Sequence, residues 1–221
     1  MTVPERTLTK TEVVVTVYAR AARFYDLWGT LTETRARRRA LELAHVRDGQ
    51  SVLEVAVGTG LAFAELLQCN PNGRNEGIDL TEAMLVKARE KAERSSATNW
   101  RLRVGDAYHL DFGPATFDLL LNCYMFDLLP EADFGGVLGE FHRVLKPSGR
   151  LVLVNLASGD GVVSWVWSQV YHVRPAWVGG CRGVRMAAHV GEAGLTIETS
   201  ERLSQFGVPS EVMVARSRRQ S

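Results

Sequence analysis

The chain has few cysteines, and none of them is spaced for metal binding. Its 221 residues include only Cys69, Cys123 and Cys181, without a C-x-x-C pair. This spacing argues against a zinc site and a disulfide framework, so no metal is expected. No apolar run approaches the ~20 residues that cross a bilayer, and no signal-peptide pattern follows Met1. We therefore expect a cytoplasmic protein, and peripheral contact with a membrane stays open.

A strong net charge is absent as well. Lys and Arg number 26 against 25 Asp and Glu, which leaves a net charge of +1. This balance gives no general drive toward nucleic acid. The arginines nonetheless form two groups, Arg35, Arg37, Arg38 and Arg39, and then Arg216, Arg218 and Arg219. Each group is either solvated surface or a contact for anionic lipid.

What the chain does contain is a strand, a glycine turn and a helix start in direct succession. Ser51–Gly60 is an apolar run that ends in an acid and two glycines, and a helical pattern follows it. Such units hold nucleotide-like ligands at the carboxyl end of the strand, where Glu54 lies. Gly58 and Gly60 allow the ligand to approach the backbone closely. Phe63 is too large for the small residue that a dinucleotide fingerprint needs at that position.

Strands and helices alternate along most of the chain, which predicts parallel β-α-β units. After the first strand, the expected strands are 74–79, 99–104, 117–123, 150–156, 194–197 and 211–215. The expected helices are 11–28, 32–46, 61–67, 82–94, one that opens at Pro130, and 184–193. Asp79 ends the second strand, where a carboxylate accepts hydrogen bonds from ribose hydroxyls. Its alternative role is a helix cap, but Thr81 is the better cap.

Four motifs resemble, in the same order, those of class I S-adenosylmethionine-dependent methyltransferases. They are Glu54-x-Ala56-x-Gly58-x-Gly60, Gly77–Leu85, Gly105–Ala107 and Glu140–Gly149. Ala56 stands where the family usually has glycine, and Ser148 replaces another glycine. The resemblance implies an α/β fold, with a Rossmann-like seven-stranded, mostly parallel sheet, helices on both faces and the last strand antiparallel. It implies a single methyltransferase domain over 1–221, with an amino-terminal helical cap at 1–46 and a substrate lid at 158–193.

The resemblance also implies S-adenosylmethionine as the cofactor and a set of residues that bind it. These are Tyr18, Glu54, Ala56, Gly58, Thr59, Gly60, Asp79, Leu80, Met84, Gly105, Asp106, Ala107 and Asn122. In the family, the acid of the third motif binds the adenine amino group, which assigns that role to Asp106. The alternative for Asp106 is an Asx turn.

The acceptor side resembles the quinone- and phospholipid-methylating branch of this family. That resemblance implies a small or lipophilic acceptor, such as a quinol or a phospholipid amine. The expected substrate-binding residues are Tyr25, Tyr124, Arg174, Trp177 and Arg182. Tyr171 and His172 are the candidate catalytic residues, because either can take a proton from an amine or hydroxyl. The aromatic lid residues have a second interpretation, as a simple cover for the sheet.

Three other functions stay open at this point. The first is a methyltransferase whose acceptor is a soluble phenol, amine or thiol. The second is a nicotinamide-dependent oxidoreductase, which Phe63 disfavours. The third is a regulator that binds the cofactor without turnover.

Overall fold

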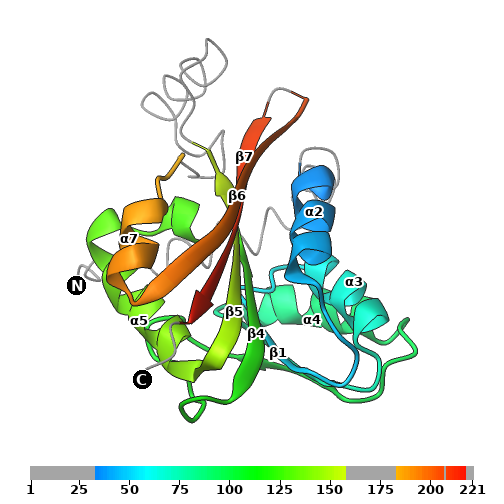
Figure 1. Ribbon diagram of the computed structural model, residues 1–221. Helices are drawn as coiled ribbons and strands as arrows, with labels where there is room; N and C mark the ends of the chain where they lie inside the picture. Colours follow the sequence, from blue (N-terminus) through cyan, green and yellow to red (C-terminus); the bar gives the residue numbers. More distant parts are fainter. Residues whose placement is uncertain (1–32, 158–182, 207, 218–221) are drawn as a thin grey trace, which may run out of the picture.

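The computed structural model describes residues 33–157, 183–206 and 208–217, and its centre is one seven-stranded sheet (Figure 1). The strands are β1 (Ser51–Val55), β2 (Arg74–Asp79), β3 (Trp100–Val104), β4 (Phe117–Cys123), β5 (Leu145–Leu156), β6 (Leu195–Gln205) and β7 (Val208–Ser217). Their order across the sheet is β3-β2-β1-β4-β5-β7-β6. The order reverses between β1 and β4, and open α/β sheets bind ligands beside such a point.

All strands but β7 run in the same direction. The pairs from β3 to β5 are parallel, and β7 is antiparallel to both of its neighbours, β5 and β6. The predicted fold class, with a mostly parallel sheet and an antiparallel last strand, is therefore confirmed.

Helices cover both faces of this sheet (Figure 1). One face carries α2 (Thr34–Ala44), α3 (Leu61–Cys69) and α4 (Glu82–Ala92). The other face carries α5 (Phe134–Val144) and α7 (Ala187–Glu192). Two short 3₁₀ turns, η1 (Phe126–Leu128) and η2 (Glu131–Asp133), precede α5, so the helix expected to open at Pro130 begins later. No helix among the described residues is long and apolar enough to cross a membrane.

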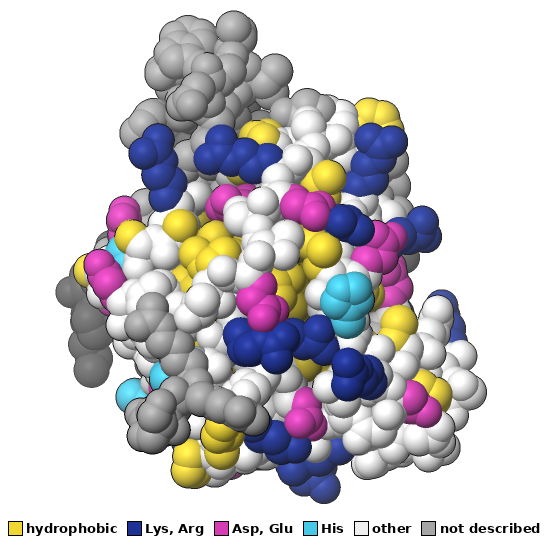
Figure 2. Space-filling model, viewed as in Figure 1, with side chains coloured by type: hydrophobic (Ala, Val, Ile, Leu, Met, Phe, Trp, Pro, Cys, Tyr) yellow, Lys and Arg dark blue, Asp and Glu magenta, His cyan; other side chains and the backbone are white. Residues whose placement is uncertain are grey.

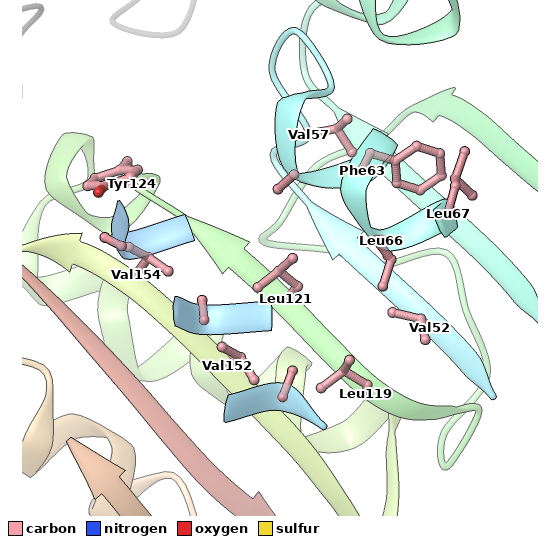
Figure 3. Packing of buried hydrophobic residues seen from close by; sticks show 14 of the residues in the cluster. Val52, Val57, Phe63, Leu66, Leu67, Leu119, Leu121, Tyr124, Val152 and Val154 are labelled. Carbon is pink, nitrogen blue, oxygen red and sulfur yellow. The ribbon is translucent and has the colours of Figure 1, made fainter. Parts of the chain in front are cut away.

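The alternating side chains of the central strands form two separate cores. Toward α3, Val52 of β1, Leu121 of β4 and Val152 of β5 form one apolar layer with Phe63 and its helical neighbours (Figure 3). Residues one position along each strand point the other way and pack against α5. A strand buried on both faces needs a nearly continuous apolar sequence, and β4 has one. These two cores hold the carboxyl edge of the sheet rigidly in place.

Two of the four arginines in the group on α2 are neutralised within the protein. Arg37 is buried and donates to Glu65, with its Nη2 atom 3.0 Å from Oε1. Arg39 pairs with Glu201 at 2.7 Å. Arg216, from the second group, pairs with Glu198 at 2.6 Å. The interpretation as a contact for anionic lipid therefore loses Arg37, Arg39 and Arg216, while Arg35 and Arg38 are exposed.

The described ends of the expected cap and lid belong to the layers that flank the sheet. Helix α2 packs against β5, β6 and β7. Helix α7 packs against α5 and β6, and buries Val190. The remaining residues of the cap and the lid lie outside the described ranges.

Candidate functional site

The loop between β1 and α3 has three residues in the left-handed backbone region. Their φ angles are +59° at Ala56, +56° at Gly58 and +83° at Gly60. Gly60 also caps the amino end of α3. Glycine adopts this region freely and alanine does not. Alanine at position 56, where the family usually has glycine, therefore strains the backbone locally, and the loop still makes its turn.

We expect Ala56→Gly to raise the free energy of unfolding by up to about 1 kcal/mol. The left-handed conformation costs an L-residue roughly 1–2 kcal/mol, and the added freedom of glycine in the unfolded chain offsets part of this gain. Chemical denaturation measures the change. Ala64→Gly, inside α3, is the matched control, and it should lower stability by about 1 kcal/mol. Equal losses in both variants would contradict the strain at Ala56.

Backbone hydrogen bonds tie the loops of the three amino-terminal motifs together. Val57 N–H donates to the Ile78 carbonyl, and Gly105 N–H donates to the Asp79 carbonyl, each at 3.0 Å. The strands β1, β2 and β3 are neighbours, so their carboxyl ends lie at one edge of the sheet. The site residues predicted on these three loops are thus brought together.

Asp79 lies at the centre of this edge. Its Oδ2 atom accepts the Gly58 N–H at 2.8 Å, and its Oδ1 atom accepts the Thr81 N–H at 2.9 Å. Burial raises the pKa of the Asp79 carboxyl, and the hydrogen bonds from Thr81 and Gly58 act in the opposite direction. A carboxylate has about four acceptor sites, so Asp79 can still accept a ligand hydroxyl. Thr81 occupies the cap position of α4 as expected, but its side chain makes no cap hydrogen bond.

The remaining second- and third-motif residues differ in exposure. Leu80 is 41% exposed, so an apolar surface lies open beside Asp79. Asp106 is exposed, and its Oδ1 atom accepts the Tyr108 N–H at 2.9 Å, which is the Asx-turn geometry. That bond uses one of its oxygens and leaves the other for a ligand. Met84 is buried on α4, and Ala107 is partly buried beside Asp106.

Glu54 is a buried carboxylate that lacks a full set of partners. It is 1% exposed, and its Oε2 atom has no hydrogen-bond partner among the residues the structure describes. Burial raises the pKa of Glu54 well above its ordinary value; Arg37 acts to lower it, and Asp79 and Glu65 raise it further. Burial also raises the pKa of nearby Glu33 to about 7. Carboxylates thus outnumber the guanidinium here, which suits a cationic ligand.

The raised pKa of Glu54 predicts that the free energy of unfolding depends on pH. Glu54→Gln should reduce this dependence. A carboxyl whose pKa is higher in the folded state binds protons more tightly when folded, so the free energy of unfolding falls as the pH rises above its ordinary pKa. Without ligand, the wild type should therefore lose stability between about pH 5 and about pH 8. The Glu54→Gln slope should be smaller by up to about 1.4 kcal/mol per pH unit, the value for one proton. Urea unfolding at both pH values tests this, and equal slopes would contradict an elevated pKa at Glu54.

Two predicted residues at the end of β4 already have protein partners. The Asn122 Nδ2 atom donates to the Val55 carbonyl at 2.9 Å, while its buried Oδ1 atom has no partner in the described part of the chain. The Tyr124 hydroxyl lies 2.9 Å from the Ser210 hydroxyl. Burial raises the pKa of Tyr124 well above its ordinary value. Both side chains therefore fix the end of β4 against β1 and β7.

Seven of the predicted site residues lie outside the described residues. They are Tyr18, Tyr25, Tyr171, His172, Arg174, Trp177 and Arg182. Conversely, sequence reasoning missed the charged group around Glu54. Arg37 and Glu65 were hidden among ordinary helical charges, and only their positions on the inner faces of α2 and α3 distinguished them.

Comparisons with known proteins agree with this geometry. Residues 52–149 match the family described as "Methyltransferase domain". A demethylmenaquinone methyltransferase of Listeria welshimeri is 31% identical over 166 residues, covering 72% of this chain and 68% of the relative. A phosphatidylethanolamine N-methyltransferase of Cereibacter sphaeroides is 37% identical over 145 residues, covering 65% of this chain and 68% of the relative.

A solved structure extends the likeness in fold to nearly the whole chain. It is a Burkholderia thailandensis 1,6-didemethyltoxoflavin-N1-methyltransferase with bound S-adenosylhomocysteine, at a TM-score of 0.70 and 20% identity. The match covers 98% of this chain and 94% of that one.

The described residues fit S-adenosylmethionine, a nucleoside that carries a positive sulfonium and an ammonium. The glycine loop permits close approach, Asp79 has acceptor capacity for ribose hydroxyls, and Glu54 has an unpartnered buried oxygen beside further carboxylates. The motifs, the strand order and the relatives lead to the same conclusion: this chain belongs to the class I S-adenosylmethionine-dependent methyltransferases.

Proposed function

We propose that the enzyme methylates a small lipophilic acceptor of the quinol or phospholipid-amine class. The observation that carries this proposal is the similarity to two relatives, one named for demethylmenaquinone and one for phosphatidylethanolamine. These acceptors differ in the atom that is methylated, but both combine a polar reacting group with long apolar chains. The shared property, a lipophilic acceptor, is therefore what the similarity supports.

In this proposal, each part of the cofactor has a partner on the chain. The loop from Ala56 to Gly60 lies against the amino acid part, whose ammonium faces Glu54. Asp79 accepts the ribose hydroxyls, and the open surface of Leu80 lies against the adenine, with Asp106 at its amino group. When bound, S-adenosylmethionine supplies a methyl group that its sulfonium activates.

The chain's own contribution to transfer is alignment and exclusion of water. An in-line displacement at an activated methyl group needs the acceptor held at a near-attack distance. The sulfonium charge disappears in this reaction, so a dry site favours it. Tyr124 lies at the carboxyl end of β4, and we propose that it lines the acceptor side. Tyr18 and Tyr25 are proposed to cover the cofactor and the acceptor from the amino-terminal segment.

The lid supplies the remaining roles in this proposal. Trp177 provides apolar surface for the acceptor chains. Arg174 and Arg182 bind a phosphate if the acceptor is a phospholipid, because a guanidinium forms paired hydrogen bonds with phosphate oxygens. Tyr171 or His172 takes the proton that the acceptor loses. Contact with a membrane surface is the expected route to such an acceptor.

Turnover with methyl-labelled S-adenosylmethionine and a total cell extract tests this proposal. After partition, we expect label in the organic phase when the wild type is added and not when the control variant is added. Asp79→Ala, which should bind the cofactor about 100-fold more weakly, serves as the control. Label confined to the aqueous phase would contradict a lipophilic acceptor and favour a soluble phenol, amine or thiol.

Arg182→Ala distinguishes the two lipophilic classes. With a phospholipid acceptor, KM should rise about tenfold or more, the effect of losing a charge-assisted hydrogen bond. With a quinol, which has no phosphate, KM should stay unchanged. Affinity for S-adenosylhomocysteine, measured in parallel, should not change in either case.

A further inference from the structure

A pocket lies at the end of the sheet opposite the glycine loop. Its volume is about 240 Å³, and its lining comes from the loop between α2 and β1, the starts of β4 and β5, and the end of β7. The start of β5 and the end of β7 lie at the lower edge in Figure 1. The pocket is therefore separated from the cofactor edge by the length of the parallel strands.

Positive side chains dominate the lining of this pocket. Arg47, Lys146, Arg150 and Arg216 contribute four cationic groups, and Asp118 is the acidic residue among the lining residues. Figure 2 shows Lys and Arg side chains in the lower half of this face as well as near its top. A concave site lined mainly by one sign of charge concentrates ligands of the opposite sign.

The carboxylates at the pocket are already engaged. Both Asp118 oxygens lie 2.9 Å from Lys146 Nζ, and one also accepts the Ser51 N–H. Glu198 is paired with Arg216. Lys146 and Arg216 are thereby neutralised.

Two guanidinium groups remain without a carboxylate partner among the described residues. Arg150 donates through Nη2 to the His45 carbonyl at 3.0 Å, and its other donors make no further bond there. The guanidinium of Arg47 has neither an ion pair nor a hydrogen bond within the described ranges; its hydrogen bonds there are backbone ones, both with Gln50. Burial, Arg216 and Arg47 together lower the pKa of Arg150, because they disfavour its positive charge. A bound anion relieves this repulsion.

We propose that this pocket binds a phosphate-bearing anion through Arg47 and Arg150. A guanidinium presents several N–H donors in one plane, which matches the oxygens of a phosphate group. The volume is below the roughly 300–1,000 Å³ of ordinary small-molecule sites, so a phosphate group with a small substituent is the fitting size. The site is independent of the methyl acceptor, because it lies at the other edge of the sheet.

The phosphate group has two sources, a soluble phosphate ester and a lipid headgroup. A membrane docked at this pocket would face the amino edge of the parallel strands, whereas the cofactor loops lie at the carboxyl edge. This arrangement favours the soluble source, and the experiment has one arm for each.

Calorimetric titration with inorganic phosphate tests the first source, and sedimentation with phosphatidylglycerol vesicles tests the second. Whichever of the two probes the wild type binds, the Arg47→Gln/Arg150→Gln variant should bind it at least about tenfold more weakly. The control Arg94→Gln/Arg101→Gln removes the same charge from exposed positions and should bind like the wild type. Arg47→Gln alone keeps the test valid if the double variant does not fold, because Arg47 is exposed.

The outcomes separate clearly. Phosphate binding that only the pocket variant loses supports a soluble ligand, and vesicle binding with the same pattern assigns the site to a lipid headgroup. Equal losses in both double variants would mean general charge attraction and would overturn the proposal. Absence of binding to both probes in the wild type would also overturn it.

Discussion

Asp79→Ala should weaken the binding of S-adenosylmethionine by about 100-fold or more. The estimate follows from roughly 3 kcal/mol for hydrogen bonds to a charged group that the ribose hydroxyls lose. The variant also loses the acceptor of the Gly58 N–H, which fixes the glycine loop to the end of β2. Calorimetric titration with S-adenosylhomocysteine measures the change.

Asp111→Ala is the matched control for this loss. Asp111 is an aspartate with a 96% exposed side chain that pairs with Arg103. Its removal should leave the affinity unchanged. Unchanged affinity in Asp79→Ala itself would remove Asp79 from the cofactor site.

Gly60→Ala should destabilise the protein by about 3 kcal/mol, from overpacking together with the cost of a left-handed alanine. An added Cβ atom at Gly60 would lie 2.7 Å from the Ala88 Cα atom, and backbone cannot yield as a flexible side chain does. The start of α3 would have to move away from α4, and the glycine loop would move with it. Denaturant unfolding and cofactor titration should therefore both show the defect.

Gly58→Ala separates steric conflict from backbone strain in the same loop. Its φ is also positive, but a Cβ atom there would meet nothing within 4 Å. In the absence of ligand, this variant should lose only about 1 kcal/mol. If Gly60→Ala is no more damaging than Gly58→Ala, close packing between α3 and α4 is not what requires glycine at position 60.

Sequence reasoning located the first strands and their turns well because local patterns encode them. The predicted strands 74–79 and 117–123 match β2 and β4 residue for residue. An apolar strand that ends in an acid and a glycine turn carries its own boundary, since the turn residues interrupt the pattern. Gly58, Gly60 and Asp79 could therefore be placed at the carboxyl ends of β1 and β2 before any tertiary contact was known.

The bounds of the strands on the β6 side of the sheet were less predictable from the sequence. The expected strand 194–197 became β6, which extends to Gln205. Because β6 is one of the two edge strands, most of its residues after Ile197 are polar or partly exposed, and no apolar run marks it. The expected strand 150–156 began earlier, at Leu145, through a turn in which Ser148 has a φ of +67°. Pairing with neighbouring strands determined both boundaries.

Charge arrangement was the second feature beyond the reach of sequence patterns. Arg37 appeared as one of four neighbouring arginines, yet it alone of them is buried. The group at the amino edge combines Arg47, Arg150 and Arg216 from three distant segments. Only the folded sheet brings such residues together, so no spacing along the chain could identify them.

A crystal structure of the enzyme grown with S-adenosylhomocysteine tests the central claim most directly. The account predicts the ligand at the carboxyl edge of β1, β2 and β3, with its ribose hydroxyls within hydrogen-bond distance of Asp79. Its ammonium should lie on the side of Glu54, and its adenine should lie against Leu80. Ligand bound away from the glycine loop, or a ribose that does not contact Asp79, would contradict this account.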